Sequence, residues 1–408
     1  MSSYKERFEE YSKIKDQLDF LYPGCKFTAL VKAGDPVVTL DRWNNKESVV
    51  TVPGFVSAIG PGAFGKNEKI NRVIIPANVE YIAEFAFADC RNLYEVVFEK
   101  GSTLEKIANI AFMNTALEKI DIPASVKMID VHAFQNCKRL KEINFPVNSA
   151  LSDIAMGAFA GSGLVKVSLP SALSHVGPQA FLECKDLKEV YIWPSSALQA
   201  FADGVFAGTA ITKITIPQKL QLICANAFLG CHLLKDVRFA SDCQLKEIHA
   251  RAFAETAIER ISIPESVEEI GRQAFAKCAK LKEIDFAAKG KLKHIADGAF
   301  AGSALAKLTV PASVEAIDHH AFLECKNLSK VGFARGSKLT ELSECLFALS
   351  GLQKISIPAS VEKVNRQVFF KCTELKEIKV SKNAKLKLIA RDCLLGAKLQ
   401  KFPPKPKV

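Results

Sequence analysis

The sequence predicts an α/β solenoid of about 15 coils that alternate between 22 and 25 residues and form a curved parallel β-sheet. Three columns of residues carry this prediction, because each recurs at a fixed interval along the chain. A Phe column starts at Phe64, takes one step of 23 residues and then alternates steps of 25 and 22, and Leu394 continues it. A Pro column and a Cys column, starting at Pro76 and Cys90, recur every 47 residues. The full period is therefore one short and one long coil.

Each coil begins with a predicted strand. Apolar and polar residues alternate over six residues, as in 281–286, which predicts a strand with one buried face. In short coils the column Pro closes the strand, where a missing N–H does least harm. The following segment, such as 266–275, has apolar residues three to four apart. That spacing predicts a brief helical turn, or an irregular segment, that returns to the next strand.

The Phe and Cys columns are predicted to build the interior. Phe rings of successive coils are expected to pack on one another, which explains the 27 Phe without a cofactor. Cys residues 47 apart lie two coils apart, at roughly 9–10 Å, and a disulfide needs Cα atoms within about 7 Å. Small polar residues such as Thr115 and Ser162 occupy the same column in the intervening coils. The column therefore predicts a buried turn with satisfied backbone groups.

An outward charged column alternates in sign along the predicted strands, beginning with Arg72, Glu95 and Lys119. Neighbouring strands would place opposite charges side by side, which fixes the register. The alternation fails at Lys330, which stands between Lys307 and Lys354. Three consecutive cations on one face are unfavourable unless an anion binds there, so these lysines are candidates for a binding role.

The next outward position is regular in short coils, where small polar residues dominate, and irregular in long coils. Tyr and Arg in the irregular column are types enriched at interface hot spots. Because solenoids usually bind through their concave sheet, a protein-binding site is predicted there. Its candidate residues are Asn144, Tyr191, Arg238, Asp285, Lys307, Lys330 and Lys354.

The net charge of +11 is concentrated at one end of the chain. Residues 376–408 carry ten basic and two acidic side chains, whereas residues 1–50 are neutral. This end predicts docking to an acidic surface: an acidic protein filament, nucleic acid or an anionic membrane. An acidic protein is favoured over nucleic acid, because the aromatic platforms that stack single strands are lacking. The candidate docking residues are Lys376, Lys379, Lys382, Lys385, Lys387 and Arg391.

The ends of the array are predicted to be capped. Residues 1–50 are assigned to an N-terminal helical cap, 51–402 to the solenoid and 403–408 to a C-terminal tail. A partner-binding helix is the alternative for the first segment. A strand is expected to begin at Leu399 and to stop at Pro403. The helical stripe that supports the cap consists of Tyr4, Phe8, Tyr11, Leu18 and Leu21.

No enzyme, cofactor or metal site is predicted. Residues 60–67 nearly match two nucleotide-binding fingerprints, but Asn67 stands where Ser or Thr should hold magnesium, and the segment is the repeat itself. The cysteines outside the column and the seven His show no metal-ligand spacing, and the pair His319 and His320 is expected to be solvated. Catalytic motifs are lacking as well.

The sequence also bears on location. The first twenty residues lack the apolar core of a secretory signal, and no stretch of about 18 apolar residues occurs. These observations predict an intracellular, cytoplasmic protein.

Residues 263–284 show the repeat most fully, with Ile263, Pro264, Ser266, Val267, Ile270, Gly271, Ala274, Phe275, Cys278, Leu281 and Ile284. This pattern resembles the BspA-like, or Treponema-type, leucine-rich repeat, and the resemblance covers about residues 50–402. It implies a leucine-rich-repeat fold and a recognition role, often as a surface adhesin. The function predicted first is a non-catalytic scaffold that binds a protein through the concave sheet. Docking of an acidic surface at the basic end, and adhesion if the protein is exported, are the alternatives.

Overall fold

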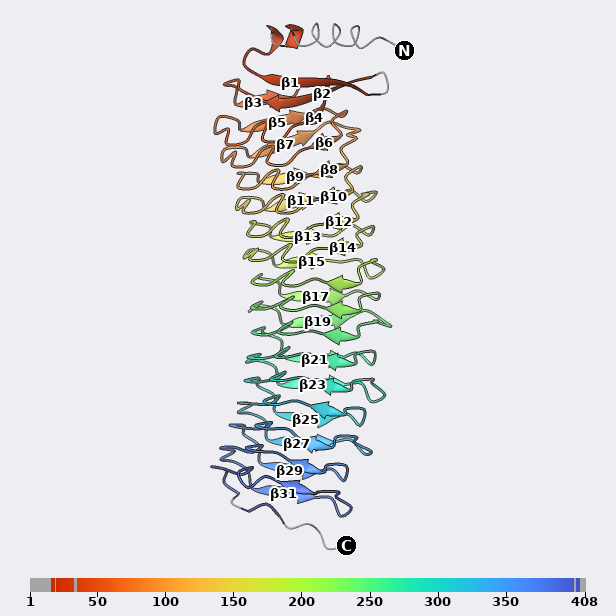
Figure 1. Ribbon diagram of the computed structural model, residues 1–408, viewed down its shortest axis with the longest axis vertical. Helices are drawn as coiled ribbons and strands as arrows, with labels where there is room; N and C mark the ends of the chain where they lie inside the picture. Colours follow the sequence, from red (N-terminus) through yellow and green to blue (C-terminus); the bar gives the residue numbers. More distant parts are fainter. Residues whose placement is uncertain (1–15, 19, 33–34, 400, 404–408) are drawn as a thin grey trace. The chain divides into compact units, whose positions relative to one another are not determined.

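The computed structural model describes residues 16–18, 20–32, 35–399 and 401–403. The chain divides into two compact units, Met1–Trp193 and Pro194–Val408. In both units the coils contribute two short parallel strands and not the single strand predicted (Figure 1). We call the first the ladder strand, because it carries the charged column, and the second the return strand.

The first unit begins with an antiparallel hairpin, β1 (Lys26–Lys32) and β2 (Asp35–Arg42). Its ladder strands are β3 (Val49–Thr51), β5 (Arg72–Ile75), β7 (Glu95–Phe98), β9 (Lys119–Asp121), β11 (Glu142–Asn144), β13 (Lys166–Ser168) and β15 (Glu189–Tyr191). Its return strands are β4 (Val56–Ile59), β6 (Tyr81–Ile82), β8 (Lys106–Ile107), β10 (Met128–Ile129), β12 (Asp153–Ile154) and β14 (His175–Val176).

The second unit repeats this plan. Its ladder strands are β17 (Lys213–Ile216), β19 (Asp236–Phe239), β21 (Arg260–Ile263), β23 (Glu283–Phe286), β25 (Lys307–Val310), β27 (Lys330–Phe333), β29 (Lys354–Ile357) and β31 (Glu377–Val380). Its return strands are β16 (Ala200–Phe201), β18 (Leu222–Ile223), β20 (Glu247–Ile248), β22 (Glu269–Ile270), β24 (His294–Ile295), β26 (Ala316–Ile317), β28 (Glu341–Leu342), β30 (Lys363–Val364) and β32 (Leu388–Ile389).

Ladder strands pair tightly within a short–long module and loosely between modules. Strands β5 and β7 share four paired residues, and β21 and β23 share four. Strands β7 and β9, which belong to successive modules, share one, and β19 and β21 fall into separate sheets. The 47-residue period of the sequence is therefore a structural module of two coils.

The segment around each column Phe is a turn, so of the two predicted alternatives the helical one is wrong and the irregular one is observed. Residues two before and two after the Phe have positive φ, as Ile110 and Asn114 do around Phe112, each at 59°. This backbone sends hydrogen bonds to the next coil: the Phe112 N–H donates to the Ala133 carbonyl at 2.8 Å. In a helix the N–H groups instead donate to carbonyls of the same segment. The apolar spacing of three to four residues therefore reflects a turn that stacks on the next coil.

Helix is almost absent from the described residues, so the α/β class is corrected to a parallel β-solenoid of about 15 coils. Helical residues occur only at 16–18 and 20–21 within the described part. Tyr4, Phe8 and Tyr11 of the predicted stripe lie outside it. The described cap is the hairpin of β1 and β2, which seals the array by pairing β2 with β4. No strand starts at Leu399 among the residues described there.

The predicted Phe stack is confirmed. In the first unit Phe64 and Phe87 stack at 4.7 Å, and in the second Phe253 and Phe275 stack at 5.3 Å, with nearly parallel rings. Trp43 extends the stack at the capped end, 5.8 Å from Phe64. Each fully buried ring stabilises the fold by about 2–3 kcal/mol. The column thus forms a continuous spine in each unit.

The Cys column has the predicted structural role. The Cys137 thiol donates to the Phe112 carbonyl at 3.1 Å and lies 3.2 Å from the Thr115 hydroxyl, which itself donates to that carbonyl at 2.9 Å. The thiols of Cys184, Cys231 and the column cysteines of later coils donate to the equivalent carbonyls in the same way. All twelve cysteines are free. Thiol and hydroxyl together satisfy a buried turn carbonyl.

Candidate functional site

The outward side chains of the ladder strands form what we call the ladder face of each unit. The predicted charge alternation produces ion pairs between neighbouring strands: Arg72 with Glu95 at 2.8 Å and Arg260 with Glu283 at 3.5 Å. Lys354 approaches Glu377 at 3.7 Å. All these side chains are well exposed, so each pair contributes at most about 1 kcal/mol. The ladder therefore fixes register more than it stabilises the fold.

On the ladder face of the first unit, the predicted residues Asn144 and Tyr191 line one cavity of about 270 Å³. The amide of Asn144 donates to Asp121 at 2.7 Å, so it is held in place. Lys166 and Glu189, which pair on adjacent strands, belong to its polar lining together with Glu142 and Ser168. The structure thus brings together two residues that sequence reasoning placed in the same column, 47 residues apart.

An exposed aromatic pair stands beside this cavity. Tyr191 is 50% exposed and Trp193 is 43% exposed. Their ring centroids lie 5.3 Å apart in an edge-to-face arrangement. Sequence reasoning missed Trp193, which lies just beyond the end of β15. Its spacing of two residues from Tyr191 could have indicated it. Two large aromatic rings that are exposed to solvent and packed against each other form a favourable contact surface for a partner.

On the ladder face of the second unit, Arg238 lines a cavity of about 1120 Å³ between β19 and β21. The guanidinium pairs with Asp236 of its own strand at 2.8 Å. Asp285 lies in a neighbouring cavity of about 830 Å³ and accepts two hydrogen bonds from Arg260, at 2.7 and 2.9 Å. Both cavities lie at module junctions, where the ladder strands are not paired.

The three lysines that break the alternation are in register. Lys307 pairs with Lys330 across β25 and β27, and Lys330 pairs with Lys354 across β27 and β29. All three side chains are exposed. Among the residues that the structure describes, no acid lies within ion-pair distance of Lys307 or Lys330. We call this set the lysine run.

The six predicted docking residues of the basic end are all exposed: Lys376, Lys379, Lys382, Lys385, Lys387 and Arg391. Two of them pair with acids, Lys379 with Glu377 at 3.4 Å and Lys387 with Glu362 at 2.7 Å. The hydrogen bond from Lys387 lowers the pKa of the Glu362 carboxyl. The remaining four keep their positive charge open to solvent.

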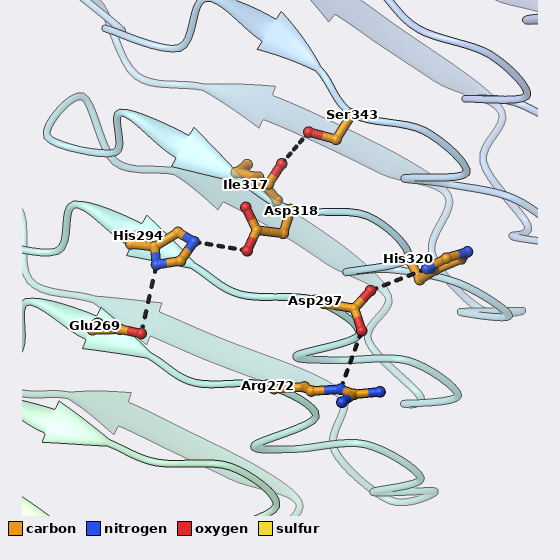
Figure 2. Close-up of polar contacts among 8 residues, drawn as sticks. All are labelled: Glu269, Arg272, His294, Asp297, Ile317, Asp318, His320 and Ser343. Carbon is orange, nitrogen blue, oxygen red and sulfur yellow. Dashed lines mark hydrogen bonds and ion pairs between the residues drawn. The ribbon is translucent and has the colours of Figure 1, made fainter.

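A cluster that the sequence did not predict lies on the return strands of the second unit and on the turns that follow them (Figure 2). His294 on β24 stands between Asp318 at 2.9 Å and Glu269 at 3.5 Å. Asp297 likewise stands between His320 at 3.0 Å and Arg272 at 3.4 Å. His320, which was expected to be solvated, keeps a side chain that is 45% exposed and hydrogen-bonds Asp297 as well.

The cluster does not converge on a point. Across the described ranges, no three His, Cys, Asp or Glu side chains gather as metal ligands. Figure 2 shows why: each bridge links successive coils along the stack, so the acids lie on opposite sides of the imidazole. The arrangement ties coils together as the ladder does.

The buried thiols are poor nucleophiles. Burial raises the pKa of Cys137, Cys184, Cys231, Cys278 and Cys325 to about 11. Reactivity requires the thiolate, and a thiol with a pKa of about 11 is almost entirely protonated at neutral pH. In the described chain these side chains therefore serve packing and hydrogen bonding.

Comparisons with known proteins address the fold. A family model described as the BspA type leucine rich repeat region matches residues 44–105, 57–188, 105–235, 199–329 and 293–407. No curated protein matches the chain. In the described residues, no helix has the length and apolarity that crossing a membrane requires.

Solved structures of bacterial repeat proteins are similar to the chain. A leucine-rich repeat protein from Bacteroides ovatus is 24% identical, with a TM-score of 0.65, over 91% of this chain and 90% of that one. The pneumococcal vaccine antigen PcpA is 21% identical, with a TM-score of 0.50, over 90% and 97%. Likeness at this identity shows the fold alone.

Proposed function

The chain belongs to the BspA-type leucine-rich repeat family, and from this premise we propose that it binds a protein partner through its ladder faces, without catalysis. Repeat folds of this kind serve as general scaffolds for protein interaction. A solenoid places outward side chains at regular intervals along a surface, whereas catalysis needs groups that converge in a pocket. The regular charges and the shallow cavities of the ladder faces favour a binding role.

The observation that carries the proposal is the exposed pair of Tyr191 and Trp193. Elsewhere on the ladder face of the first unit, the outward side chains are charged or polar apart from Val49, Ile74 and Val97. These two rings are therefore its exposed aromatic contact area. Aromatic residues beside a well-formed pocket dominate interface energetics. The adjoining 270 Å³ cavity, lined by Asn144 and Lys166, would receive one partner side chain.

The test is affinity capture with the tagged full-length chain from native lysate, comparing wild type with Tyr191→Ala and Trp193→Ala. We expect each variant to lose the captured partner, because a hot-spot truncation costs about 2 kcal/mol or more of binding. Tyr81→Ala is the matched control, since Tyr81 is 40% exposed on a return strand of the same unit. A partner that survives both ladder-face variants, or that Tyr81→Ala also removes, contradicts the proposal.

A second candidate role is docking of an acidic surface at the basic end. Four exposed cations without an acid partner in the described chain favour it: Lys376, Lys382, Lys385 and Arg391. Such binding would weaken steeply with salt, unlike contacts of the aromatic pair. Stepwise salt elution of the captured partner separates the roles. Early elution that charge reversal of these four residues abolishes would assign the partner to the basic end. The cytoplasmic location stays a prediction.

A further inference from the structure

One cavity in the second unit is lined by basic and hydroxyl side chains alone among its polar ones. It has a volume of about 570 Å³ and lies at the ends of β27, β29 and β31. Its charged side chains are Arg335 and Lys379, and no acid lines it. Four hydroxyls complete the lining, those of Ser337, Ser356, Ser360 and Ser381.

This charge balance sets the cavity apart. Four other cavities of the chain contain acids. These are Asp236, Asp242, Glu259 and Glu265 in the cavity of about 1120 Å³, Glu283 and Asp285 in that of about 830 Å³, Asp41 and Glu68 near the hairpin, and Glu142 and Glu189 beside Tyr191. Each of these cavities therefore pairs its cations with at least two carboxylates. The cavity at β27–β31 presents two cations and no carboxylate, so it is suited to a negatively charged ligand.

The lysine run adjoins the cavity on the same strands. Lys330 begins β27 and Lys354 begins β29, and the cavity lies at the other ends of these strands. Like charges on neighbouring strands are unfavourable, so this stretch keeps an electrostatic cost that a bound anion would relieve. Glu377 offsets only part of it, since it is already shared by Lys354 at 3.7 Å and Lys379 at 3.4 Å.

Gly332 opens the surface between these groups. Long coils carry a side chain at its position, Tyr191 in β15 and Asp285 in β23, whereas β27 carries none. A Cβ there would meet only Thr309 Oγ1 at 3.7 Å and the Leu308 carbonyl at 3.9 Å. Space is therefore left where a ligand would enter between the cations.

One cavity hydroxyl also has free hydrogen-bonding capacity. Ser360 Oγ is buried and has no hydrogen-bond partner. The equivalent Ser125 donates to the carbonyls of Ser102 and Leu104, at 2.9 and 2.8 Å. The hydroxyl of Ser313 is unpartnered as well. An unpartnered serine is therefore not specific to this cavity, whereas the excess of cations is.

We propose that this cavity, together with the lysine run, binds the phosphoryl group of a phosphorylated segment of a partner protein. A phosphate dianion accepts several hydrogen bonds at once, and it favours sites that combine a guanidinium, ammonium groups and hydroxyls. A cavity of 570 Å³ holds a side chain but not a nucleic-acid duplex. The inference rests on the proposed function, because it assigns the partner's chemistry on the ladder face of the second unit.

The test measures binding of the purified full-length chain to immobilised peptides with degenerate flanks around a central phosphoserine, serine or glutamate. We expect the phosphoserine peptides to bind at least about tenfold more tightly than the serine peptides, and Lys330→Glu to remove this difference. Equal binding of phosphoserine and serine peptides overturns the proposal. Glutamate peptides that bind as tightly as phosphoserine also overturn it, since a carboxylate would then suffice.

Lys330→Glu is informative because it restores the alternating ladder between Lys307 and Lys354, so a folding defect would not explain lost binding. The matched control is Lys289→Glu, which makes the same charge change at an exposed lysine of the same unit. An equal loss in this control would assign the binding to net charge and overturn the proposal.

Two competitors identify the source of the anion. Inorganic phosphate that competes as well as the phosphopeptide, or a DNA duplex that binds more tightly and depends equally on Lys330, overturns the assignment to a partner segment. The proposed function can fail separately. If Tyr191→Ala does not reduce capture of the partner and phosphopeptide binding is intact, only the role of the aromatic pair is contradicted. Loss of phosphopeptide selectivity with capture intact removes only this inference.

Discussion

Two neighbouring stretches of the second unit have the same interior and opposite outward character. On β21 and β23, Arg260 meets Asp285 at 2.7 Å, so the charges of the ladder are balanced. On β25 and β27, Lys307 faces Lys330, and Gly332 stands where β23 has Asp285. The first stretch pairs its charges within the chain, whereas Lys307 and Lys330 of the second have no acid partner among the described residues.

Beneath the surface the two stretches hardly differ. Phe275 and Phe300 stack at 5.4 Å, and Phe300 and Phe322 stack at 5.6 Å. Cys278 and Cys325 each donate to a turn carbonyl, at 3.1 and 3.2 Å. The inner columns therefore specify the coil, and the outward positions are free to vary because the core does not depend on them. The predictions below test this separation.

Truncating the spine should give the largest effect, and the same effect in both stretches. We expect Phe275→Ala and Phe322→Ala each to lower the free energy of unfolding by about 3–5 kcal/mol, because each leaves a cavity at a fully buried ring. Urea denaturation followed by far-UV circular dichroism measures both. A cost at Phe322 several times smaller than that at Phe275 would show that the outward charges do reach the core.

Alkaline pH should destabilise both stretches equally through their thiols. Burial raises the pKa of Cys278 and of Cys325 from 9.0 to about 11. Below pH 9 the thiol is protonated in the folded and unfolded chain, so stability does not depend on it. Between these values only the unfolded thiol ionises, and stability falls by about 1.4 kcal/mol per pH unit for each thiol.

The measurement is urea denaturation between the two pKa values. Cys278→Ala and Cys325→Ala should each make the pH slope shallower by that same amount, whatever they do to stability at neutral pH. Slopes that remain as steep as that of the wild type would contradict the assignment of alkaline lability to buried thiols.

The fold could be predicted largely from the sequence because its columns are periodic. Phe112, Cys137 and Thr115 recur at intervals that only a stack of coils satisfies. The return strands could not be predicted, since two residues such as His294 and Ile295 are too few to show a period. A helical turn and an irregular segment could not be told apart around the column Phe, because left-handed residues such as Ile110 do not alter the apolar spacing. The hairpin cap was missed because it lies outside the repeat.

The candidate site could be predicted in part for the same reason. The alternating charges of the ladder column can be read from the sequence, so the sequence alone identifies Lys330 as the break in the alternation. Trp193 and Arg335 were missed, since both lie beyond the ends of their strands. Ser356 belongs to the regular small polar column of the short coils, which was assigned to the scaffold and not to a site. The bridge of His294 to Asp318 depends on the register of return strands, which the sequence did not reveal.

Exchanging the outward charges should sharpen the comparison at lower cost. We expect Lys330→Glu to raise the free energy of unfolding, and Glu283→Lys to lower it, by about 0.2–1 kcal/mol for each neighbouring pair changed. Lys330 has two such neighbours in register, Lys307 and Lys354. Urea denaturation at low and high salt measures both, and the difference should shrink at high salt. Destabilisation by Lys330→Glu would mean that the lysine run serves the fold.

The smallest effect is expected at Gly332. Because a Cβ there finds ordinary contacts at 3.7 and 3.9 Å, Gly332→Ala should raise the free energy of unfolding by about 0.5–1 kcal/mol, as a strand glycine loses chain entropy on folding. Gly271 in the balanced stretch is the control, since its Cβ would lie 2.8 Å from the Ile248 carbonyl and Gly271→Ala should destabilise. Thermal and urea midpoints of the two variants decide the matter. If Gly332→Ala destabilises as well, the backbone itself requires glycine at this position. The space beside the lysine run would then not support an opening for a ligand.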